Sequence, residues 1–219
     1  QEVVHPEITV EGRRSIFSTS EGIARGVYIR AAPSDQNQYL LEGARIYNPL
    51  HFGGVMSTFN VDALRDVQVI AGGVPPFYGG RIGGILDLSI RDGTEKALEG
   101  TAAVGSLSSS LVLEGPLANQ TTFLVSGRQS YPDVLLQRYH SYARPSDLNS
   151  SEAMAKVTHH LSDNQRLSLG GYLSWDTYRN RVVEGGGNEL VNSLRWRNAS
   201  ASIRWITIVP PSLFLFTSA

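Results

Sequence analysis

The most informative segment of the chain is Tyr78-Gly79-Gly80-Arg81-Ile82-Gly83-Gly84-Ile85-Leu86-Asp87-Leu88, in which four glycines precede an alternating β-prone run. Glycine allows a positive φ and lets the backbone approach a neighbouring segment closely. A phosphate-binding loop also gathers glycines, but it needs a Lys-Ser/Thr pair and a following helix, and neither pattern is present here. The segment therefore predicts a tight turn that leads into a strand over residues 85–90.

Upstream of this segment, short β-prone pieces alternate with Gly- and Pro-rich turns. Between two of them, Asn60 is a candidate N-cap and Asp62 lies in the first turn that follows, which predicts a short helix over residues 60–65. Residues 1–25 are a polar lead that we expect to be a flexible tail. The pattern predicts a small mixed α/β unit over residues 27–93, with strands at residues 27–30, 38–41, 44–47, 67–70 and 85–90.

After Gly93 the pattern changes to longer alternating runs. In one of them, Leu167, Leu169 and Leu173 would lie on one face of a strand, because they are separated by an even number of positions, and the other face would be polar. About six runs of about ten residues are present, which is the length that a tilted strand needs to cross a bilayer. They cover residues 101–114, 121–130, 152–161, 165–176, 198–205 and 212–219.

The links between these runs alternate between short and long. Residues 115–120 and 162–164 are short links, whereas residues 131–151 and 178–190 are long ones. This asymmetry is typical of an outer-membrane barrel, with short periplasmic turns and long surface loops. A soluble antiparallel sandwich remains the alternative, because it shows the same alternation and buries its apolar face against a second sheet.

The amino-acid composition excludes several classes of protein and of functional site. The chain has 219 residues, of which 41% are hydrophobic and 18% charged, so a folded protein is expected. A net charge of −1 gives no general attraction to nucleic acid, and the absence of cysteine excludes disulfides and thiolate sites. Without a catalytic motif or a spaced set of metal ligands, we expect no enzyme, metal or cofactor. The start at Gln1, with no signal-peptide pattern, leads us to expect that such a peptide is absent or already removed.

Three ordered motifs carry a resemblance to a known family. They are Val27-Tyr28-Ile29-Arg30, the run from Gln36 to Pro49, and Gly72-Gly73-Val74-Pro75 continuing through Leu88. Together they resemble the plug domain of TonB-dependent outer-membrane receptors, particularly the branch common in Bacteroidetes, and residues 111–116 and 125–128 resemble the first two barrel strands. The resemblance implies an α+β plug domain (residues 26–97) after an N-terminal tail (residues 1–25). Antiparallel transmembrane β-barrel strands would follow over residues 98–219, as an incomplete barrel of about six strands in the bacterial outer membrane.

The resemblance also implies site residues. The segment from Pro6 to Gly12 resembles a TonB box, which the family offers to a TonB-type periplasmic energy-coupling protein, and an extended segment can add as a strand to such a partner. Arg30 is the candidate for locking the plug to a wall carboxylate. The remaining candidates are the TonB-box residues Glu7, Ile8, Thr9 and Val10, the plug hinge glycines Gly79, Gly80, Gly83 and Gly84, and the ligand-loop residues Tyr139, Tyr142 and Arg144.

The chain departs from the family pattern in three places. Only residues 13–26 lie between the box and the strand that ends at Arg30, Ala31-Ala32 replace two glycines, and Ala71 replaces a basic residue. A complete barrel of this family has about twenty-two strands, which about six strands cannot close.

The function implied is ligand-gated, energy-dependent uptake of a nutrient such as an iron chelate or a glycan. Outer-membrane lipid is an expected partner, further receptor or lipoprotein subunits are possible ones, and nucleic acid is not expected. The alternative is a truncated, receptor-like structural or binding subunit of a larger outer-membrane assembly, without transport activity. A native mass close to 23.9 kDa would favour this alternative.

Overall fold

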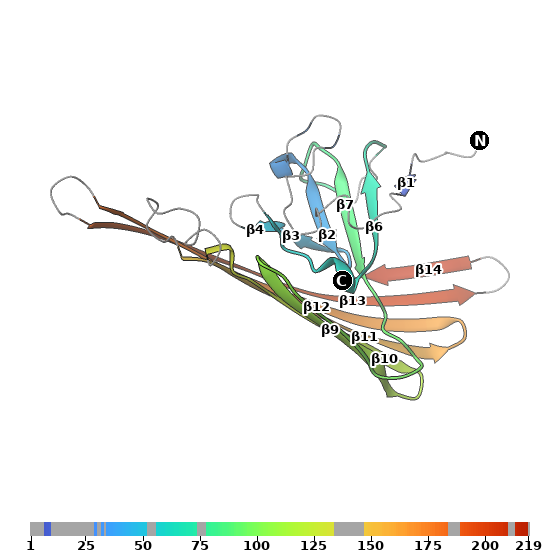
Figure 1. The fold of residues 1–219 in the computed structure, drawn as a ribbon. Helices are drawn as coiled ribbons and strands as arrows, with labels where there is room; N and C mark the ends of the chain where they lie inside the picture. The colour runs from blue at the N-terminus through green and yellow to red at the C-terminus, as the bar shows by residue number, and fades with distance from the viewer. Residues whose placement is uncertain are drawn as a thin grey trace.

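The computed structural model describes residues 7–9, 29, 32, 34–51, 56–73, 78–133, 147–183, 189–209 and 213–218. Its strands form a five-stranded sheet, a seven-stranded sheet and a two-stranded pair. We call the elements from β1 to β7 the plug unit and those from β8 to β14 the wall. Figure 1 shows the plug unit standing against one face of the long wall strands.

The plug unit is built on a mixed sheet with the order β1-β6-β7-β2-β3. Its central strand β7 is antiparallel to β6 and parallel to β2. The predicted strands at residues 38–41 and 85–90 have the predicted bounds. The sheet consists of β1 (Glu7–Thr9), β2 (Gln38–Leu41), β3 (Ala44–Ile46), β6 (Leu64–Ile70) and β7 (Ile85–Ile90).

Short elements complete the plug unit. They are the 3-10 turns η1 (Ser34–Gln36) and η2 (Val61–Ala63), and the paired strands β4 (Leu50–His51) and β5 (Met56–Ser57). Asn60 caps η2 by accepting a hydrogen bond from the Asp62 amide at 3.2 Å, as its sequence position predicts. The predicted helix is nevertheless only one 3-10 turn, because Leu64 and Arg65 already belong to β6.

The tail expected over residues 1–25 includes one ordered element. Glu7–Thr9 form β1, which pairs antiparallel with β6 at the edge of the plug sheet, so Ile8 lies opposite Val69. Main-chain pairing to a sheet edge therefore replaces the expected loose chain for these three residues.

The wall is one antiparallel sheet with the order β14-β13-β12-β11-β10-β9-β8. It is open, since β8 and β14 lie at opposite edges. The hairpin of β12 and β13 extends well beyond the plug unit (Figure 1). The strands are β8 (Glu99–Val104), β9 (Ser108–Ala118), β10 (Thr121–Ser130), β11 (Asp147–Ser162), β12 (Gln165–Val183), β13 (Glu189–Val209) and β14 (Leu213–Ser218).

The wall has one strand more than the six alternating runs predict. Residues 101–114 read as a single run, but the chain folds back in the middle of it and forms the β8–β9 hairpin. The Gly105 amide donates to the Ser108 carbonyl at 2.8 Å and closes the turn. The odd-numbered residues on both sides of the turn include small and apolar ones that the sequence places on one face, whereas the pairing of Ala102 with Leu111 puts even-numbered residues of β8 on the face of odd-numbered residues of β9.

The polarity of the wall decides between a barrel wall and a sandwich. A sandwich would bury the leucine face of β12, but Leu169 is 51% exposed and Leu173 is 44% exposed. The opposite face is covered by the plug unit, and it buries polar side chains such as Ser174 and Asp176. The sandwich alternative is therefore wrong, because the apolar face points outward and the polar face inward.

One hydrophobic core cluster joins the plug unit to the wall. The core cluster combines plug residues with a few inward side chains of the wall, namely Val112, Leu124, Met154 and Tyr172. Among the described residues, no helix has the length and apolarity needed to cross a bilayer. The fold thus places a small mixed sheet against the polar side of a large antiparallel one.

Candidate functional site at the plug–wall interface

The contact between the plug unit and the wall is unusually polar for a buried surface. Inward positions of the wall strands carry hydroxyl and charged groups that the plug unit covers. Buried polar groups need partners, because an unpaired one costs free energy on leaving water. Those that are buried include Thr122, Ser126, Ser130, Ser150, Glu152, Lys156, Thr158, Ser168, Ser174 and Asp176.

Lys156 of β11 is the centre of the first charged cluster. Its Nζ lies 2.9 Å from Glu42 Oε1 and 2.8 Å from Asp92 Oδ1, and it donates to the Ile90 carbonyl at 2.9 Å. These three contacts use all three ammonium donors. A wall lysine is thereby held entirely by the plug unit and by the segment that leaves it.

Glu42 connects this cluster to a second wall strand. It lies at the tight turn between β2 and β3 with a φ of 53°, a left-handed conformation that is uncommon for a residue with a side chain. Its Oε1 accepts from the Ile90 amide at 2.6 Å, and its Oε2 lies 3.2 Å from Arg204 Nη1 of β13. One plug carboxylate therefore bridges β11 and β13.

Asp92 follows β7 where the chain leaves the plug unit. Besides Lys156, it pairs with Arg166 of β12 at 3.2 Å and with Arg65 of β6 at 3.1 Å. Burial raises the pKa of Asp92, but the nearby charges of Lys156, Arg166 and Arg65 outweigh burial and lower it below the usual value. Asp92 is therefore ionised at neutral pH and anchors the start of the connection to the wall.

His51 of β4 is the centre of the second cluster. Its Nδ1 lies 2.7 Å from Asp176 Oδ1 on β12, and its Nε2 lies 2.8 Å from Glu152 Oε2 on β11. None of the three side chains is more than 1% exposed. Burial lowers the pKa of His51, but the hydrogen bonds and charges of Asp176 and Glu152 exceed this effect, so the pKa is raised.

Arg128 of β10 supports the His51 cluster from the wall. Its Nη2 donates to Glu152 Oε2 at 3.0 Å, and its Nε lies 2.7 Å from Glu152 Oε1. The same Nη2 also contacts the Ser57 carbonyl in the plug unit. Arg128 therefore contacts both sides of the interface.

Neutral contacts lie between the two charged clusters. The Phe59 and Tyr172 rings pack with centroids 5.8 Å apart, and the Tyr172 hydroxyl donates to the Thr58 carbonyl at 3.2 Å. Asn60 Nδ2 donates to Ser126 Oγ at 2.9 Å. The residue that caps η2 thus also attaches it to the wall.

The four glycines chosen from the sequence have different surroundings. Gly80 has a φ of +106°, which a residue with a side chain rarely adopts. A Cβ on Gly83 would lie 2.3 Å from Asn37 Oδ1, and one on Gly84 would lie 2.5 Å from Ile29 Cγ2, whereas Gly79 has open space. Close packing therefore requires Gly83 and Gly84, and a hinge role for all four stays a prediction.

The other predicted site residues are not gathered at this interface. Glu7, Ile8 and Thr9 form β1, whose pairing with β6 is given above, and their role as a TonB box stays a prediction. Four further candidates lie outside the described residues, namely Val10, Tyr139, Tyr142 and Arg144. The lock candidate Arg30 also lies outside them, so its predicted wall partner stays a prediction.

Sequence reasoning missed the charged residues that do join plug and wall. A signal for them was present, since Glu152, Lys156 and Asp176 all occupy the polar parity of wall strands. A charge in the middle of a covered strand face needs a partner. Their partners Glu42 and His51 gave no such signal, because each lies in a short plug segment.

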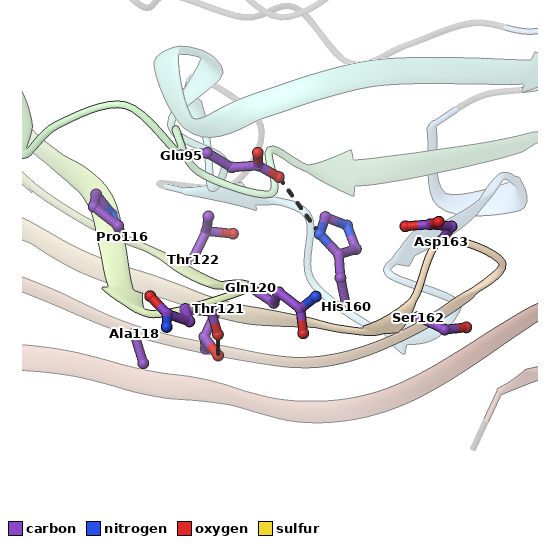
Figure 2. Close-up of a pocket in the computed structure, with 10 residues that line it drawn as sticks. Glu95, Pro116, Ala118, Gln120, Thr121, Thr122, His160, Ser162 and Asp163 are labelled. Atoms are coloured by element: carbon purple, nitrogen blue, oxygen red, sulfur yellow. Dashed lines mark hydrogen bonds and ion pairs between the residues drawn. The ribbon is translucent and has the colours of Figure 1, made fainter.

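A pocket of about 490 Å³ lies at the end of the wall where the tight turns gather. Figure 2 shows Glu95, from the connection between plug unit and wall, facing His160 at 3.4 Å. The rest of the lining is mostly hydroxyl, amide and carboxylate groups: Thr121, Thr122, Asn119, Gln120, Ser162 and Asp163, with Pro116 and Ala118. Among the described residues, no group of three or more acidic or histidine side chains is placed to hold a metal ion.

Comparison with known proteins relates part of the chain to a known family of domains. Residues 5–85 match the family model described as TonB-dependent Receptor Plug Domain. A 71-residue segment is 31% identical to the TonB-dependent transporter Oar of Myxococcus xanthus, and it covers 32% of this chain and 7% of that protein. The match to the family model therefore lies in the part of the chain that contains the plug unit.

Solved structures show that the fold extends into the wall. The ferripyoverdine receptor of the Pseudomonas aeruginosa outer membrane is similar over 85% of this chain and 28% of its own, with 14% identity and a TM-score of 0.57. The outer membrane transporter YddB of Escherichia coli is similar over 86% of this chain and 31% of its own, with 16% identity and a TM-score of 0.54. The chain spans less than a third of the length of these relatives.

These matches agree with the geometry, in which a mixed sheet covers the polar face of a wall whose apolar face points outward. The family consists of receptors and transporters that interact with TonB. The plug unit is thus similar to a TonB-dependent receptor plug domain, and the chain as a whole has the fold of the plug and wall strands of outer-membrane receptors.

Proposed function

We propose that this chain is the plug and part of the wall of a ligand-gated, energy-dependent transporter that takes up a nutrient such as an iron chelate or a glycan. The observation that carries the proposal is the charged plug–wall contact, in which Glu42 and Asp92 of the plug side hold Lys156, Arg166 and Arg204 of the wall. A contact of this kind closes a pore and still allows release.

The physical reason is the behaviour of ion pairs when they separate. Two buried charges lose hydration on pairing and regain it when water enters between them, so the net free energy of opening is modest. An apolar contact of the same area would lose its hydrophobic stabilisation without any such gain. A plug held by ion pairs is thus stable at rest and can be displaced by a moderate force.

Strand β1 is the element on which the energy-coupling protein would act. It has only three residues and pairs with β6 alone, at the edge of the plug sheet. An extended segment of this kind can leave one sheet edge and add to another through the same main-chain hydrogen bonds. We propose that a TonB-type periplasmic protein takes up the segment of Glu7, Ile8, Thr9 and Val10 in this way.

The proposed transport is tested by uptake in cells that carry the natural polypeptide containing these 219 residues. Radiolabelled ferric chelates and oligosaccharides are supplied one at a time, with the membrane proton gradient intact or collapsed. We expect one class to bind in both states and to enter only with the gradient intact. Proline at Ile8 should stop entry and leave binding intact, because it removes a main-chain donor.

Two results would contradict transport. Binding without entry in energised cells would favour the alternative of a binding or structural subunit. Entry that continues after the gradient collapses would show a passive pore. Ile8→Val serves as the matched control at the same position, since it keeps the main-chain donor and a β-branched side chain and should leave entry unchanged.

A further inference from the structure

The environment of His51 determines how many protons its ring carries. Both ring nitrogens face carboxylate oxygens, Asp176 Oδ1 at 2.7 Å and Glu152 Oε2 at 2.8 Å, with water excluded from all three side chains. A neutral imidazole has one N–H donor and one lone pair. Its lone pair would then face an ionised oxygen at hydrogen-bond distance with no proton between them. Only the doubly protonated ring donates to both carboxylates.

The charge balance of the cluster points to the same protonation state. Among the described residues, Glu152 of β11 and Asp176 of β12 are the charged groups that face the ring, and Arg128 of β10 lies behind Glu152. With a charged ring, two cations meet two carboxylates. With a neutral ring, one buried negative charge has no counterion, which is strongly unfavourable.

Asp176 depends most on the proton of His51. Its second oxygen, Oδ2, is buried and has no hydrogen-bond partner in the part of the chain that the structure describes. At the same parity of β12, Tyr172 donates its hydroxyl to the Thr58 carbonyl. If His51 loses its proton, Glu152 keeps Arg128, whereas Asp176 keeps no cation among the residues that the structure describes.

We propose that His51 is a proton-dependent positioning residue, whose imidazolium holds the plug against β11 and β12 and whose deprotonation loosens that contact. The proposal rests on the proposed function, in which the plug is displaced from the wall. It adds a proton as a second control on that displacement. Near the Lys156 cluster, burial raises the pKa of Asp87 to about 6, so the pH dependence of the contact above this value is assigned to His51.

The sign of the pH dependence follows from linkage. The pKa of the His51 ring is higher when the plug is closed than when the ring is exposed to water. The stabilising contribution of the ring to the closed plug is therefore fully present below the pKa of the exposed ring, provided that Glu152 and Asp176 stay ionised. The contribution is lost as pH rises through the pKa of the ring in the closed plug. Between these two values the open fraction should rise by at most about tenfold per pH unit.

The first experiment reads the protonation state directly. Nitrogen NMR of ¹⁵N-histidine-labelled natural polypeptide in lipid vesicles should show one ring with both nitrogens protonated at pH 7, and His51→Gln should remove that signal. His160 is the internal control, since its ring is 37% exposed and lies 3.4 Å from Glu95. A His51 ring with one protonated nitrogen at pH 7 would refute the proposal.

The second experiment measures passive leakage of a small fluorescent dye from the same vesicles between pH 6 and pH 9. Leakage of the wild type should rise with pH. Asp176→Asn should remove this rise, because an amide N–H can donate to the lone pair of a neutral ring while the ring donates to Glu152. A leakage profile of the wild type that does not change with pH would refute the proton-dependent role of His51. An Asp176→Asn profile as steep as that of the wild type would also refute it.

A pair of variants separates the loss of the His51 contact from simple damage to folding. His51→Gln should leak at every pH. Its NH₂ group can face only one of the two carboxylates, so the amide oxygen faces Asp176 when the nitrogen donates to Glu152. The double variant His51→Gln/Asp176→Asn should restore closure, because the two amides can pair. No restoration would contradict the donor arrangement, and His160→Gln should match the wild type.

Failure of the proton-dependent role of His51 and failure of transport give different results. A neutral His51 ring together with gradient-dependent uptake would refute only the proton-dependent role of His51. A charged His51 and a pH-dependent leak, without uptake in energised cells, would refute only the transport function.

Discussion

Lys156 of β11 and Glu42 at the β2–β3 turn form a buried ion pair of 2.9 Å, although 114 residues separate them in the chain. Neither side chain is more than 3% exposed. The pair joins the wall to the plug unit, and Arg204 and Asp92 extend it to further elements on both sides. The plug is thus held by charges whose partners lie on the other side of the interface.

Removing one partner of this pair should loosen the plug. Lys156→Met leaves the Glu42 carboxylate buried with fewer partners, and the expected loss is about 3–5 kcal/mol of plug–wall stability. Dye leakage from vesicles and the thermal unfolding midpoint both report it. Lys96→Met is the matched control, because Lys96 is exposed in the connection after β7 and its loss should change the stability by less than about 0.5 kcal/mol. Adding Glu42→Gln to Lys156→Met should recover part of the loss, and full additivity of the two changes would contradict a direct pair.

Alanine at Gly84 should strain the plug, whereas alanine at Gly79 should not. The added methyl group at Gly84 would lie 2.5 Å from Ile29 Cγ2, while at Gly79 no atom lies within 4 Å. We expect Gly84→Ala to lower the stability of the plug by about 1–3 kcal/mol and Gly79→Ala to change it by less than about 0.5 kcal/mol. Calorimetry of both variants measures the difference, and equal midpoints would show that the Ile29 contact is not tight.

Asp87 of β7 should make the plug less stable at neutral pH than at mildly acidic pH. Burial raises the pKa of Asp87 to about 6, which Arg204 opposes and Glu42 reinforces. The folded plug therefore binds the proton more tightly than the unfolded chain, so this contribution falls as pH rises from about 4 to about 6 and its penalty is complete above that. Asp87→Asn should raise the unfolding midpoint by ~2–4 °C at pH 7.5 and leave it unchanged near pH 4. A midpoint that falls at pH 7.5 would mean that the ionised carboxylate has a stabilising partner.

Arg30, the lock candidate from the sequence, can be compared with the Lys156 and His51 clusters. If it pairs with a wall carboxylate as the family resemblance implies, Arg30→Ala should increase dye leakage, and Arg30→Lys should restore closure only partly, because a point charge cannot form the two-pronged pair. Wild-type leakage in Arg30→Ala, measured beside a leaking Lys156→Met, would assign the lock to the described clusters and Arg30 to an ordinary strand end.

Local patterns in the sequence were sufficient for the strands and their faces. The bounds of β2 and β7 follow from short β-prone runs between turn residues, and the outward leucines of β12 follow from a period of two. The cap at Asn60 was also visible, because its hydrogen bond to Asp62 joins residues two positions apart. Each of these features depends on neighbours in the chain, which a sequence displays directly.

The tertiary structure decided what covers each face and which charges meet. Alternation on β12 is the same for a sandwich and a barrel wall, and only the packing of the plug unit on the polar side separates the two. The β8–β9 turn was hidden because residues 101–114 read as one alternating run, although the pairing of Ala102 with Leu111 shows that the faces change parity across Gly105. His51 looked like one scattered histidine among five, and its two carboxylates lie 101 and 125 residues away. Charge pairing over such separations depends on how whole sheets pack, and a linear pattern carries no measure of that distance.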